Sequence, residues 1–561
     1  MANLYTTTIT SVLDNLIPTC SFQHRPRTSD PWFDTECRMA KRQTRRLERA
    51  YAAANRRAHS TGTVLDAIRA GSVVAGIASA KAAWYTQRRA YRQLCEDKRK
   101  AFWTAQVENC HNSRQLWDAV DKLLGRGKVQ PNTDIDVSTI STFFTKKVET
   151  VRQNTAGFSP PTFSTVPDGA SYTDFQPVDT DEVIRLIRSL PNKSSDADTL
   201  PACWLKVIAA DVAPFLADLF NRSLSSGVVP DGFKTALITP IVKKQGLDVT
   251  DLKSYRPISN LPIISKLLER VVARRLVDYI ASANLLPVLQ SGFRSLHSVE
   301  TAVAKVLSDI ISAVDKGDVA ALVLLDMSAA FDTVDHQILL QRLRLSFGVD
   351  GKVLEWISSY LDRRHEIVRR GSLRSDIHVV TSGVPQGSVL GPLLFIIYTA
   401  DLIALIEKHR LIPHLYADDT QLYGSCPASQ AAGLITKLSS CLEEVANWLG
   451  SNRLQLNTSK TEFIWFATSR RLQPLLSMPL PIGADIIWPS TSVRNLGIIL
   501  DSNLTMRGHV DCTVARCFAV LRKLRSIRRS LPVSTFQTLV TSLVVSRLDF
   551  GKAVLFGLPA S

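Results

Sequence analysis

The chain has 561 residues, and its 67 Lys and Arg against 51 Asp and Glu give it a formal net charge of +16. This length implies more than one domain, and the positive balance favours a polyanion such as a nucleic acid as partner. The nine cysteines lack paired CxxC spacing, and Cys512 and Cys517 lack the following histidine of a zinc knuckle, which indicates reduced thiols in an intracellular protein. The longest apolar stretch, 389–406, is interrupted by Gly391, Pro392 and Asp401, which excludes a membrane span.

The N-terminal part is predicted to be mainly helical over 31–125, with a further helix at 138–152. The segment 38–57 holds eight Lys or Arg against one Glu, and helical spacing gathers arginines on one face. A second basic segment, 88–100, lies close to Trp84 and Tyr85. Such helices could bind RNA backbone or stack bases on their aromatic rings. The alternative is a solvated helix whose aromatic side chains anchor a core. The candidate RNA-binding residues are Arg42, Arg45, Arg46, Arg49, Arg88 and Arg89.

A segment rich in Pro, Ser and Thr follows at 154–178. Its prolines and glycine make it a linker and a poor candidate for packed structure. A helix is predicted to restart after Asp179, with Val183 and Ile187 on its apolar face and Pro191 as its stop.

An almost wholly apolar run from Ala320 to Leu325 ends on Asp326. Such a run is typical of a strand in the centre of a covered sheet, with Asp326 projecting from its end. Asp326 could also be a helix N-cap, because SAAF follows it. The two interpretations are compatible.

The stretch 383–388 (GVPQGS) reads as a turn that feeds the apolar run 389–406. Its glycines allow backbone to approach a ligand closely, which suits a nucleotide pocket. The alternative is an ordinary loop with Pro392 in the first turn of a helix.

In the alternating stretch LIPHLYADDTQLY, Asp418 and Asp419 interrupt the pattern at the expected tip of a β-hairpin. Together with Asp326 they would form a cluster of hard oxygen ligands for two Mg²⁺ ions, with Mn²⁺ as a substitute. Two such ions suit in-line phosphoryl transfer. Apolar residues from Leu434 to Leu449 then predict a long amphipathic helix that covers the sheet.

The order of the Asp326, 383–388 and Asp418 blocks resembles that of reverse transcriptases. The sequences of these blocks are most similar to those of the jockey-like group of non-LTR (LINE-type) retrotransposons. The resemblance covers roughly 179–561, with a weaker match from Trp32. Further matching blocks are KSYRPISNLPIISKLLER (Lys253 to Arg270), LQSGFRSLHS (Leu289 to Ser298), NRLQLNTSKTEF (Asn452 to Phe463), VRNLGIILD (Val493 to Asp501) and SRLDFGKAVLFGLP.

The resemblance implies roles for single residues. Asp326 and Asp418 would bind both metal ions, with Asp419 as the third carboxylate. Phe331 would lie beneath the sugar of the incoming nucleotide, although its spacing from Val334 also fits core packing. Gln386 and Gly387 would contact the incoming nucleotide and the template base. Arg256, Lys243 and Lys244 would bind the triphosphate. Lys460 would donate a proton to the departing pyrophosphate, or else it is a surface lysine.

The resemblance also implies an α+β right-hand polymerase with fingers, an antiparallel palm sheet and a helical thumb. The expected domains are a basic helical region (1–153), a linker (154–178), fingers and palm (179–470), and the palm end with a truncated thumb (471–561). Full-length members of the family carry an endonuclease before the polymerase. The chain resembles a member that lacks this domain, so target-site nicking is not expected.

The expected function is RNA-directed DNA synthesis, with an RNA template, a DNA primer and dNTPs as partners and no membrane. The family implies action in the nucleus and cytoplasm, and the oligomeric state is left open. One alternative is a truncated or domesticated element protein that binds RNA without polymerase activity. Another is a viral RNA-dependent RNA polymerase, against which Phe331 and the Tyr416-Ala417 pair argue.

Overall fold

The computed structural model describes residues 1–16, 30–59, 67–110, 112–124, 135–167, 169–193, 195, 197–244 and 246–555. The chain forms two compact units. The first comprises Met1–Thr19, Pro131–His509 and Ala553–Ser561, and the second comprises Cys20–Gln130 and Val510–Lys552. Helices and sheets are mixed in the first unit, whereas the described elements of the second unit are helical.

The helices of the first unit are α1 (Ala2–Leu16), α5 (Val137–Asn154), α6 (Thr180–Arg188), α7 (Ala202–Val207), α8 (Ala209–Ser226), α9 (Ile263–Ser282), α10 (Val299–Asp315), α11 (His336–Phe347), α12 (Gly351–Leu361), α13 (Gly391–Tyr398), α14 (Asp401–Lys408), α15 (Ala431–Ser451) and α16 (Ser469–Leu475). Its strands are β1 (Thr235–Val242), β2 (Tyr255–Asn260), β3 (Val319–Leu325), β4 (Arg364–Arg370), β5 (Leu373–Arg374), β6 (His378–Val380), β7 (Ile412–Tyr416), β8 (Asp419–Cys426), β9 (Glu462–Phe466), β10 (Leu480–Ile482), β11 (Asp485–Ile487), β12 (Ser492–Asn495) and β13 (Ile498–Asp501).

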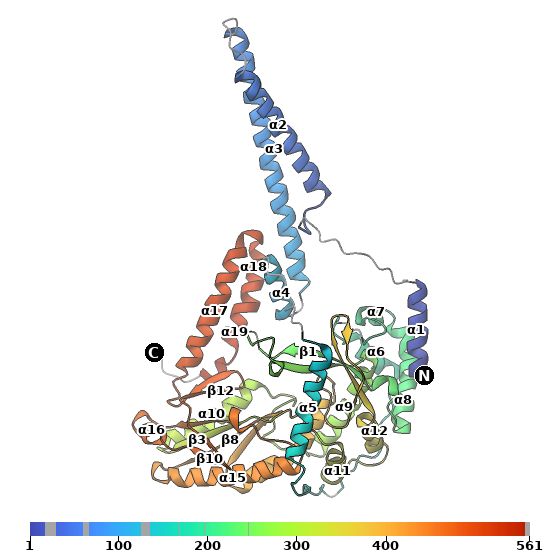
Figure 1. Ribbon diagram of the computed structural model, residues 1–561, viewed down its shortest axis with the longest axis vertical. Coiled ribbons are helices and arrows are strands. Elements are labelled where there is room, and N and C mark those ends of the chain that lie inside the picture. Colours follow the sequence, from blue (N-terminus) through green and yellow to red (C-terminus); the bar gives the residue numbers. More distant parts are fainter. Residues whose placement is uncertain are drawn as a thin grey trace. The chain divides into compact units, whose positions relative to one another are not determined.

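The first unit contains a four-stranded antiparallel sheet in the order β7-β8-β3-β9. Val319, Ala321 and Val323 of β3 join one hydrophobic cluster, while Ala320 and Leu322 join another on the opposite face. Helix α10 packs in the second cluster and α15 in the first, so the sheet is covered on both sides (Figure 1). This double burial explains why β3 is an almost unbroken apolar run, and it confirms the predicted strand.

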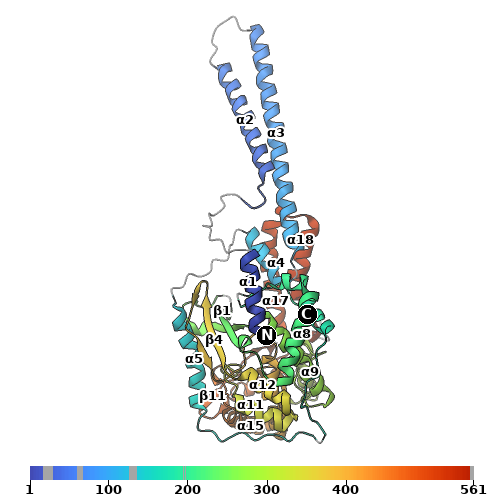
Figure 2. The same cartoon turned by 90° about the vertical axis from the view of Figure 1, so that its right-hand side faces the viewer.

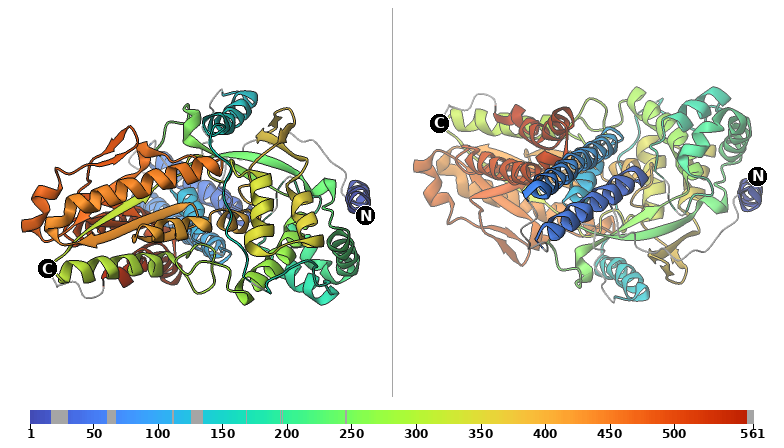
Figure 3. Two further views of the ribbon diagram at one scale, coloured as in Figure 1. Left: turned by 90° about the horizontal axis from the view of Figure 1, so that it is seen from below. Right: turned by 90° about the horizontal axis from the view of Figure 1, so that it is seen from above.

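Helix α15 confirms the predicted amphipathic helix after the hairpin. Leu438, Leu442 and Val445 on one side of it are fully buried. Seen from below, α15 lies across the strands of the four-stranded sheet (Figure 3). The helix predicted after Asp179 is also confirmed as α6, because the Asp179 side chain accepts a hydrogen bond from the Glu182 backbone N–H at 2.6 Å.

A second sheet has the order β2-β1-β4-β5, with β6 also paired to β4. Strand β1 pairs antiparallel with β2 and parallel with β4. Helix α5 lies beside β4 (Figure 2), and its Val137 and Ile140 share a hydrophobic cluster with Ile238 and Val368 of the sheet. This sheet carries the predicted phosphate-contacting residues.

The segment 155–178 forms no helix or strand, and most of its described side chains are exposed, but single residues anchor it to the first unit. Phe163 and Tyr172 pack against the main hydrophobic cluster, and the Tyr172 ring stacks on Tyr279 at 4.8 Å between centroids. The Val166 backbone N–H donates to the Leu345 carbonyl at 2.8 Å, so the segment is also held through its backbone. Its prolines prevent regular elements, but its aromatic side chains supply apolar area that favours burial.

In the second unit, α2 (Thr35–His59) and α3 (Ala67–Glu108) run side by side (Figures 1 and 2). The Trp84 ring stacks on Tyr51 at 5.5 Å, and the Arg88 guanidinium lies over the same ring at 5.5 Å. The half-buried Trp84 thus packs between α2 and α3, while the neighbouring Tyr85 is exposed. The side chains of Arg42, Arg45, Arg46, Arg49 and Arg89 are exposed, and that of Arg88 is half-buried.

A separate core joins the end of α3 to α4 (Ser113–Leu123), α17 (Arg507–Ile527) and α18 (Val533–Val540), followed by α19 (Ser546–Asp549). Val107 and Val120 pack in this cluster with Leu524 and Leu539, residues from opposite ends of the chain. Within the described ranges, no helix is both long enough and apolar enough to cross a membrane.

Candidate active site

The two parts of the predicted acidic cluster meet where the central strands β3 and β8 of the four-stranded sheet end and begin. Strand β3 pairs with β8 in a register that ends with Leu325 opposite Thr420. Asp326 follows Leu325 and Asp419 precedes Thr420, so the register places the two aspartates opposite each other. Asp418 is adjacent in the turn between β7 and β8. The structure therefore brings Asp326, Asp418 and Asp419 together from two separate segments.

The charges of these aspartates act on one another. Burial and the neighbouring charges of Asp418 and Asp326 raise the pKa of Asp419 to about 6. Burial, together with the charge of Asp326, also raises the pKa of Asp418. The Arg256 guanidinium opposes both shifts. Such mutual repulsion is typical of carboxylates that are held ready for a cation.

Asp326 also has two partners on the far side of the cluster. Its Oδ2 accepts a hydrogen bond from Asn457 Nδ2 at 2.9 Å and lies 3.2 Å from Lys460 Nζ. The Asn457 backbone N–H donates to the Asp326 carbonyl at 2.9 Å, which fixes the segment 457–460 beside the strand end. Lys460 therefore lies at the cluster, as predicted, with a side chain that is 63% exposed.

The tip of the β7–β8 hairpin is held by a segment on which sequence reasoning placed no functional residue. Ala417 adopts a left-handed backbone conformation with φ 57°, and Gln290 Oε1 accepts hydrogen bonds from the Gly292 N–H at 2.7 Å and the Ala417 N–H at 3.3 Å. A Cβ on Gly292 would come within 2.4 Å of the Ala417 nitrogen. Gln290 is only 2% exposed, so it is a buried support of the turn that carries Asp418. Its position inside the LQSGFRSLHS block was the available signal.

Basic residues of the second sheet belong to the same site. The pKa of Lys243 is lowered by burial and by the charges of Lys147, Lys460 and Arg256, and Asp326 opposes this shift. Arg256 on β2 pairs with Ile241 on β1, one residue before Val242 and two before Lys243. These positive groups thus share one electrostatic environment with the aspartates. Lys147, on α5, was not predicted to belong to this environment.

Lys244 has an exposed side chain in the turn after β1. The other predicted nucleotide contacts lie around 383–387. The Phe331 ring stacks on Phe395 at 4.7 Å, so it packs on the core while its backbone carbonyl accepts from the Val384 N–H. Gly387 has φ 113°, and a Cβ there would lie 2.8 Å from the Ser259 carbonyl oxygen. Only glycine fits this close approach without a shift of the β2 backbone.

The predicted RNA-binding arginines lie in the second unit.

Within the described part of the chain, no group of three or more His, Cys, Asp and Glu side chains has the arrangement of a metal centre. The donor chemistry nevertheless suits a hard cation, because Mg²⁺ is commonly held by one or two carboxylates with substrate phosphates completing its shell. The raised pKa values of Asp418 and Asp419 reflect negative charges that repel one another, and a bound cation would relieve this repulsion.

A family model described as reverse transcriptase (RNA-dependent DNA polymerase) matches residues 241–500. These residues contain the acidic cluster, the segment 383–387 and both sheets except the first six residues of β1. The family uses divalent metal ions in general.

Curated relatives agree with this match. The chain is 34% identical over 357 residues to a probable RNA-directed DNA polymerase from transposon BS of Drosophila melanogaster, covering 62% of this chain and 38% of the relative. It is 31% identical over 387 residues to the corresponding protein of the X-element (68% and 41%), and 29% identical over 339 residues to that of mobile element jockey (59% and 36%), both from Drosophila melanogaster. The chain thus spans about two-fifths of the length of these relatives. Residues 241–500 therefore belong to the reverse transcriptase family, in the form carried by jockey-like non-LTR retrotransposons.

Proposed function

We propose that this chain is an RNA-directed DNA polymerase that adds dNTPs to the 3′ end of a primer on an RNA template. The observation that carries the proposal is the meeting of Asp326, Asp418 and Asp419 at the ends of β3 and β8, within the electrostatic influence of Arg256 and Lys243. Carboxylates that hold cations and basic groups that hold phosphates are the two charge sets that nucleotidyl transfer requires.

Asp326 and Asp418 would hold two Mg²⁺ ions, with Asp419 as the third carboxylate. When bound, the ions would supply positive charge to the attacking 3′ oxygen and to the departing pyrophosphate. Mn²⁺ would serve as a substitute, because it accepts the same oxygen ligands. Asn457 orients the Asp326 carboxylate through its hydrogen bond at 2.9 Å.

The chain's own side chains then bind and orient the nucleotide. Arg256 would bind the triphosphate, with Lys243 and Lys244 adding positive charge. Lys460, 3.2 Å from Asp326, would donate a proton to the departing pyrophosphate. The rigidly stacked Phe331 ring would lie under the sugar and clash with a ribose 2′-OH. Gln386 and Gly387 would contact the incoming nucleotide and the template base.

The architecture that accompanies this function is a right hand with fingers, palm and thumb. The palm would be built on the β7-β8-β3-β9 sheet, with fingers before it and a helical thumb in 471–561. The basic region 1–153 would bind template RNA through the exposed face of α2, and the segment 154–178 would connect it to the polymerase. We expect the protein to act in the nucleus and cytoplasm.

Primer extension on an oligo(rA)/oligo(dT) hybrid with Mg²⁺ and labelled dTTP tests the proposal. The wild-type chain should extend the primer, and Asp418→Ala should abolish extension. Asp362→Ala is the matched control, because Asp362 is an exposed aspartate of the same unit, and its side chain contacts the neighbouring Arg363.

Extension by wild type and Asp362→Ala, with none by Asp418→Ala, supports a reverse transcriptase with the assigned site. Equal extension by all three proteins would contradict the site. Absence of extension from the wild type, with RNA binding retained, would favour an element protein that binds RNA without copying it. Incorporation of rNTPs as readily as dNTPs would favour an RNA polymerase.

A further inference from the structure

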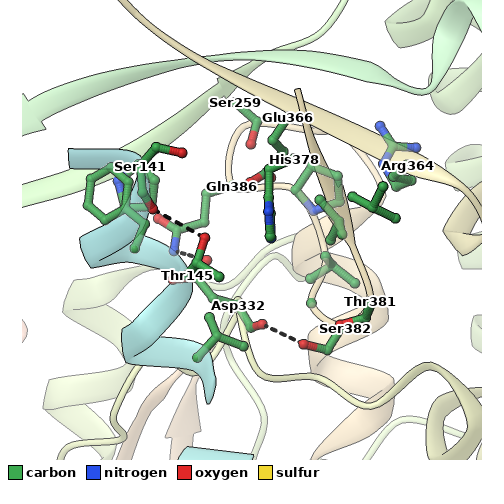
Figure 4. Close-up of a pocket in the computed structure, with 18 of the residues that line it drawn as sticks. Ser141, Thr145, Ser259, Asp332, Arg364, Glu366, His378, Thr381, Ser382 and Gln386 are labelled. Atoms are coloured by element: carbon green, nitrogen blue, oxygen red, sulfur yellow. Dashed lines mark hydrogen bonds between the residues drawn. The ribbon is translucent and has the colours of Figure 1, made fainter. Parts of the chain in front are cut away.

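Asp332 lies directly after Phe331 and is the side chain that holds the Gln386 amide. Gln386 Nε2 donates to Asp332 Oδ1 at 2.7 Å, and Ser382 Oγ donates to the Asp332 carbonyl at 3.3 Å (Figure 4). A Cβ on Gly383 would lie 2.6 Å from the same carbonyl oxygen, so the backbones of the two segments are in contact. Asp332 therefore connects the turn after β3 to the segment 382–387.

The backbone of this segment is fixed at other points. The Ser259 backbone N–H donates to the Gln386 carbonyl at 2.7 Å, and the Gly383 N–H donates to the Val334 carbonyl at 2.7 Å. Further along, the buried Glu269 carboxylate accepts from the Val389 N–H at 2.7 Å. These contacts set the path of the chain through backbone groups and do not engage the Gln386 side chain. The hydrogen bond to Asp332 is the contact that selects its rotamer.

A pocket of about 220 Å³ opens beside the contact (Figure 4). It is lined by α5, β4, β6 and the segment 381–386, so the Gln386 amide has space in which to swing away. The charged or titratable groups around Asp332 on these elements are Lys147, Glu149 and Arg152 on α5, Arg364 and Glu366 on β4, and His378 on β6.

We propose that Asp332 is a positioning residue, which holds the Gln386 amide in the orientation that the incoming nucleotide requires. This inference rests on the proposed polymerase function. It assigns a role to a carboxylate that touches neither the acidic cluster nor the nucleotide itself. The ionised carboxylate is the stronger acceptor, because a charge-assisted hydrogen bond exceeds a neutral one in strength.

The electrostatics of the pocket give this contact a pH dependence. Burial raises the pKa of Asp332 to about 6, while the Lys147 charge and the Gln386 hydrogen bond oppose the shift. The carboxylate is thus ionised above about pH 6 and becomes neutral below it, where its hold on Gln386 weakens. Burial and the neighbouring charge of Asp332 also raise the pKa of Glu366 to about 7.

The test compares Asp332→Ala with Asp332→Asn in primer extension across dNTP concentrations. Alanine removes the acceptor, so the KM for dNTP should rise about 10-fold while kcat stays within about 3-fold. Asparagine keeps an acceptor oxygen at the same place, so its KM should stay within about 3-fold of wild type at pH 8. Between pH 8 and 5.5 the ratio of KM for wild type to KM for Asp332→Asn should rise, because residue 332 titrates in the wild type and not in Asp332→Asn.

Amide hydrogen exchange of 382–387 in the chain without substrates gives a second readout. Exchange should quicken in Asp332→Ala and stay near wild type in Asp332→Asn, each measured after the thermal midpoint has shown a folded protein. Unchanged KM and unchanged exchange in Asp332→Ala would overturn the proposal, as would an equal defect in Asp332→Asn. A wild-type chain without extension would contradict the polymerase function alone, because exchange would still decide whether Asp332 holds the segment.

Discussion

The acidic cluster of the first unit and the α2 helix of the second unit hold charge in opposite ways. In the acidic cluster, the side chains of Asp418 and Asp419 are exposed, but the surrounding protein and the charge of Asp326 raise the pKa values of both. On α2, a row of arginines is exposed to solvent. Charges that the fold holds close together act through their individual positions, whereas solvent-exposed charges act mainly through the total charge of the surface. Single substitutions should therefore have large effects in one region and small effects in the other.

The largest effect is expected for Asp326→Asn. Asparagine keeps the size of the side chain and an acceptor for Asn457, but it removes the charge that a divalent ion requires. The kcat for primer extension should fall on the order of 10³-fold, as when a group that stabilises transition-state charge is removed. The thermal midpoint should stay near wild type. A loss shared by the exposed control Asp362→Asn would show that the effect is not local.

The next largest effect is expected in the free energy of unfolding, for Arg342→Lys. Arg342 is fully buried, donates to Asp401 at 3.2 Å and Asn452 at 2.9 Å, and lies among the rings of Phe163, Tyr398 and Trp448. Lysine cannot reproduce the planar donor set, so the unfolding free energy should fall by about 3 kcal/mol.

Arg46→Lys on α2 is the matched control for this change. Arg46 is exposed, and lysine is nearly as good a helix former, so the unfolding free energy should change by less than about 0.5 kcal/mol. Denaturant unfolding measures both. Equal losses of unfolding free energy in Arg342→Lys and Arg46→Lys would contradict the expected difference between a buried, hydrogen-bonded arginine and an exposed one.

A smaller effect on activity is expected for Gln290→Met. Methionine keeps the length of the side chain but leaves the N–H groups of Gly292 and Ala417 without their acceptor. The turn that carries Asp418 should then loosen, and kcat should fall about 10-fold with little change in KM. Gln290→Glu keeps the acceptor and should stay within about 3-fold of wild type. Equal defects in both variants would argue against the acceptor role.

The sequence predicted the regular elements that carry the site well. The apolar run before Asp326 and the alternation around Asp418 are local patterns, and each formed the strand it indicated. The meeting of these strands could be inferred only from the order of the motif blocks. Pairing register is a property of the sheet, and no local pattern in either segment specifies Leu325 opposite Thr420.

The supporting residues could not be predicted in the same way. Gln290 acts through its amide oxygen on the Ala417 N–H, which is 127 positions away, and Asp332 acts on Gln386 across 54 positions. Such contacts have no periodicity to reveal them. The contacts of Phe163 and Tyr172 with the main hydrophobic cluster were missed for a related reason: prolines indicate irregular backbone, but irregular backbone can still place aromatic rings against a core.

The pH dependence of stability separates buried carboxylates from solvated ones. The pKa of Glu366 is raised from 4.5 to about 7, so the folded chain holds a proton there that the unfolded chain has released. Stability therefore falls as the pH rises from about 5 to 7. Glu366→Gln carries no such proton, and at pH 8 it should be more stable than wild type by about 1–2 kcal/mol, after allowance for partial exposure.

Thermal midpoints of Glu366→Gln and wild type at pH 5 and pH 8 measure this difference. The two proteins should be close at pH 5, where both side chains are neutral. The exposed acid Glu48 on α2 provides the control, because Glu48→Gln should leave the pH dependence unchanged. A constant gap between Glu366→Gln and wild type at both pH values would contradict the raised pKa.

The smallest effect is expected for Arg46→Gln on the exposed face of α2. If the helix binds RNA through backbone charge, loss of one arginine should weaken RNA binding about threefold and lower the salt slope of log K by about one. Glu48→Gln, two positions away, should instead tighten binding slightly. Filter binding to a non-specific RNA across a salt series measures both. If the arginines of α2 only keep the helix soluble, both variants and the wild type should have identical RNA affinities and salt slopes. Charges that do not contact RNA release no counterions when the RNA binds.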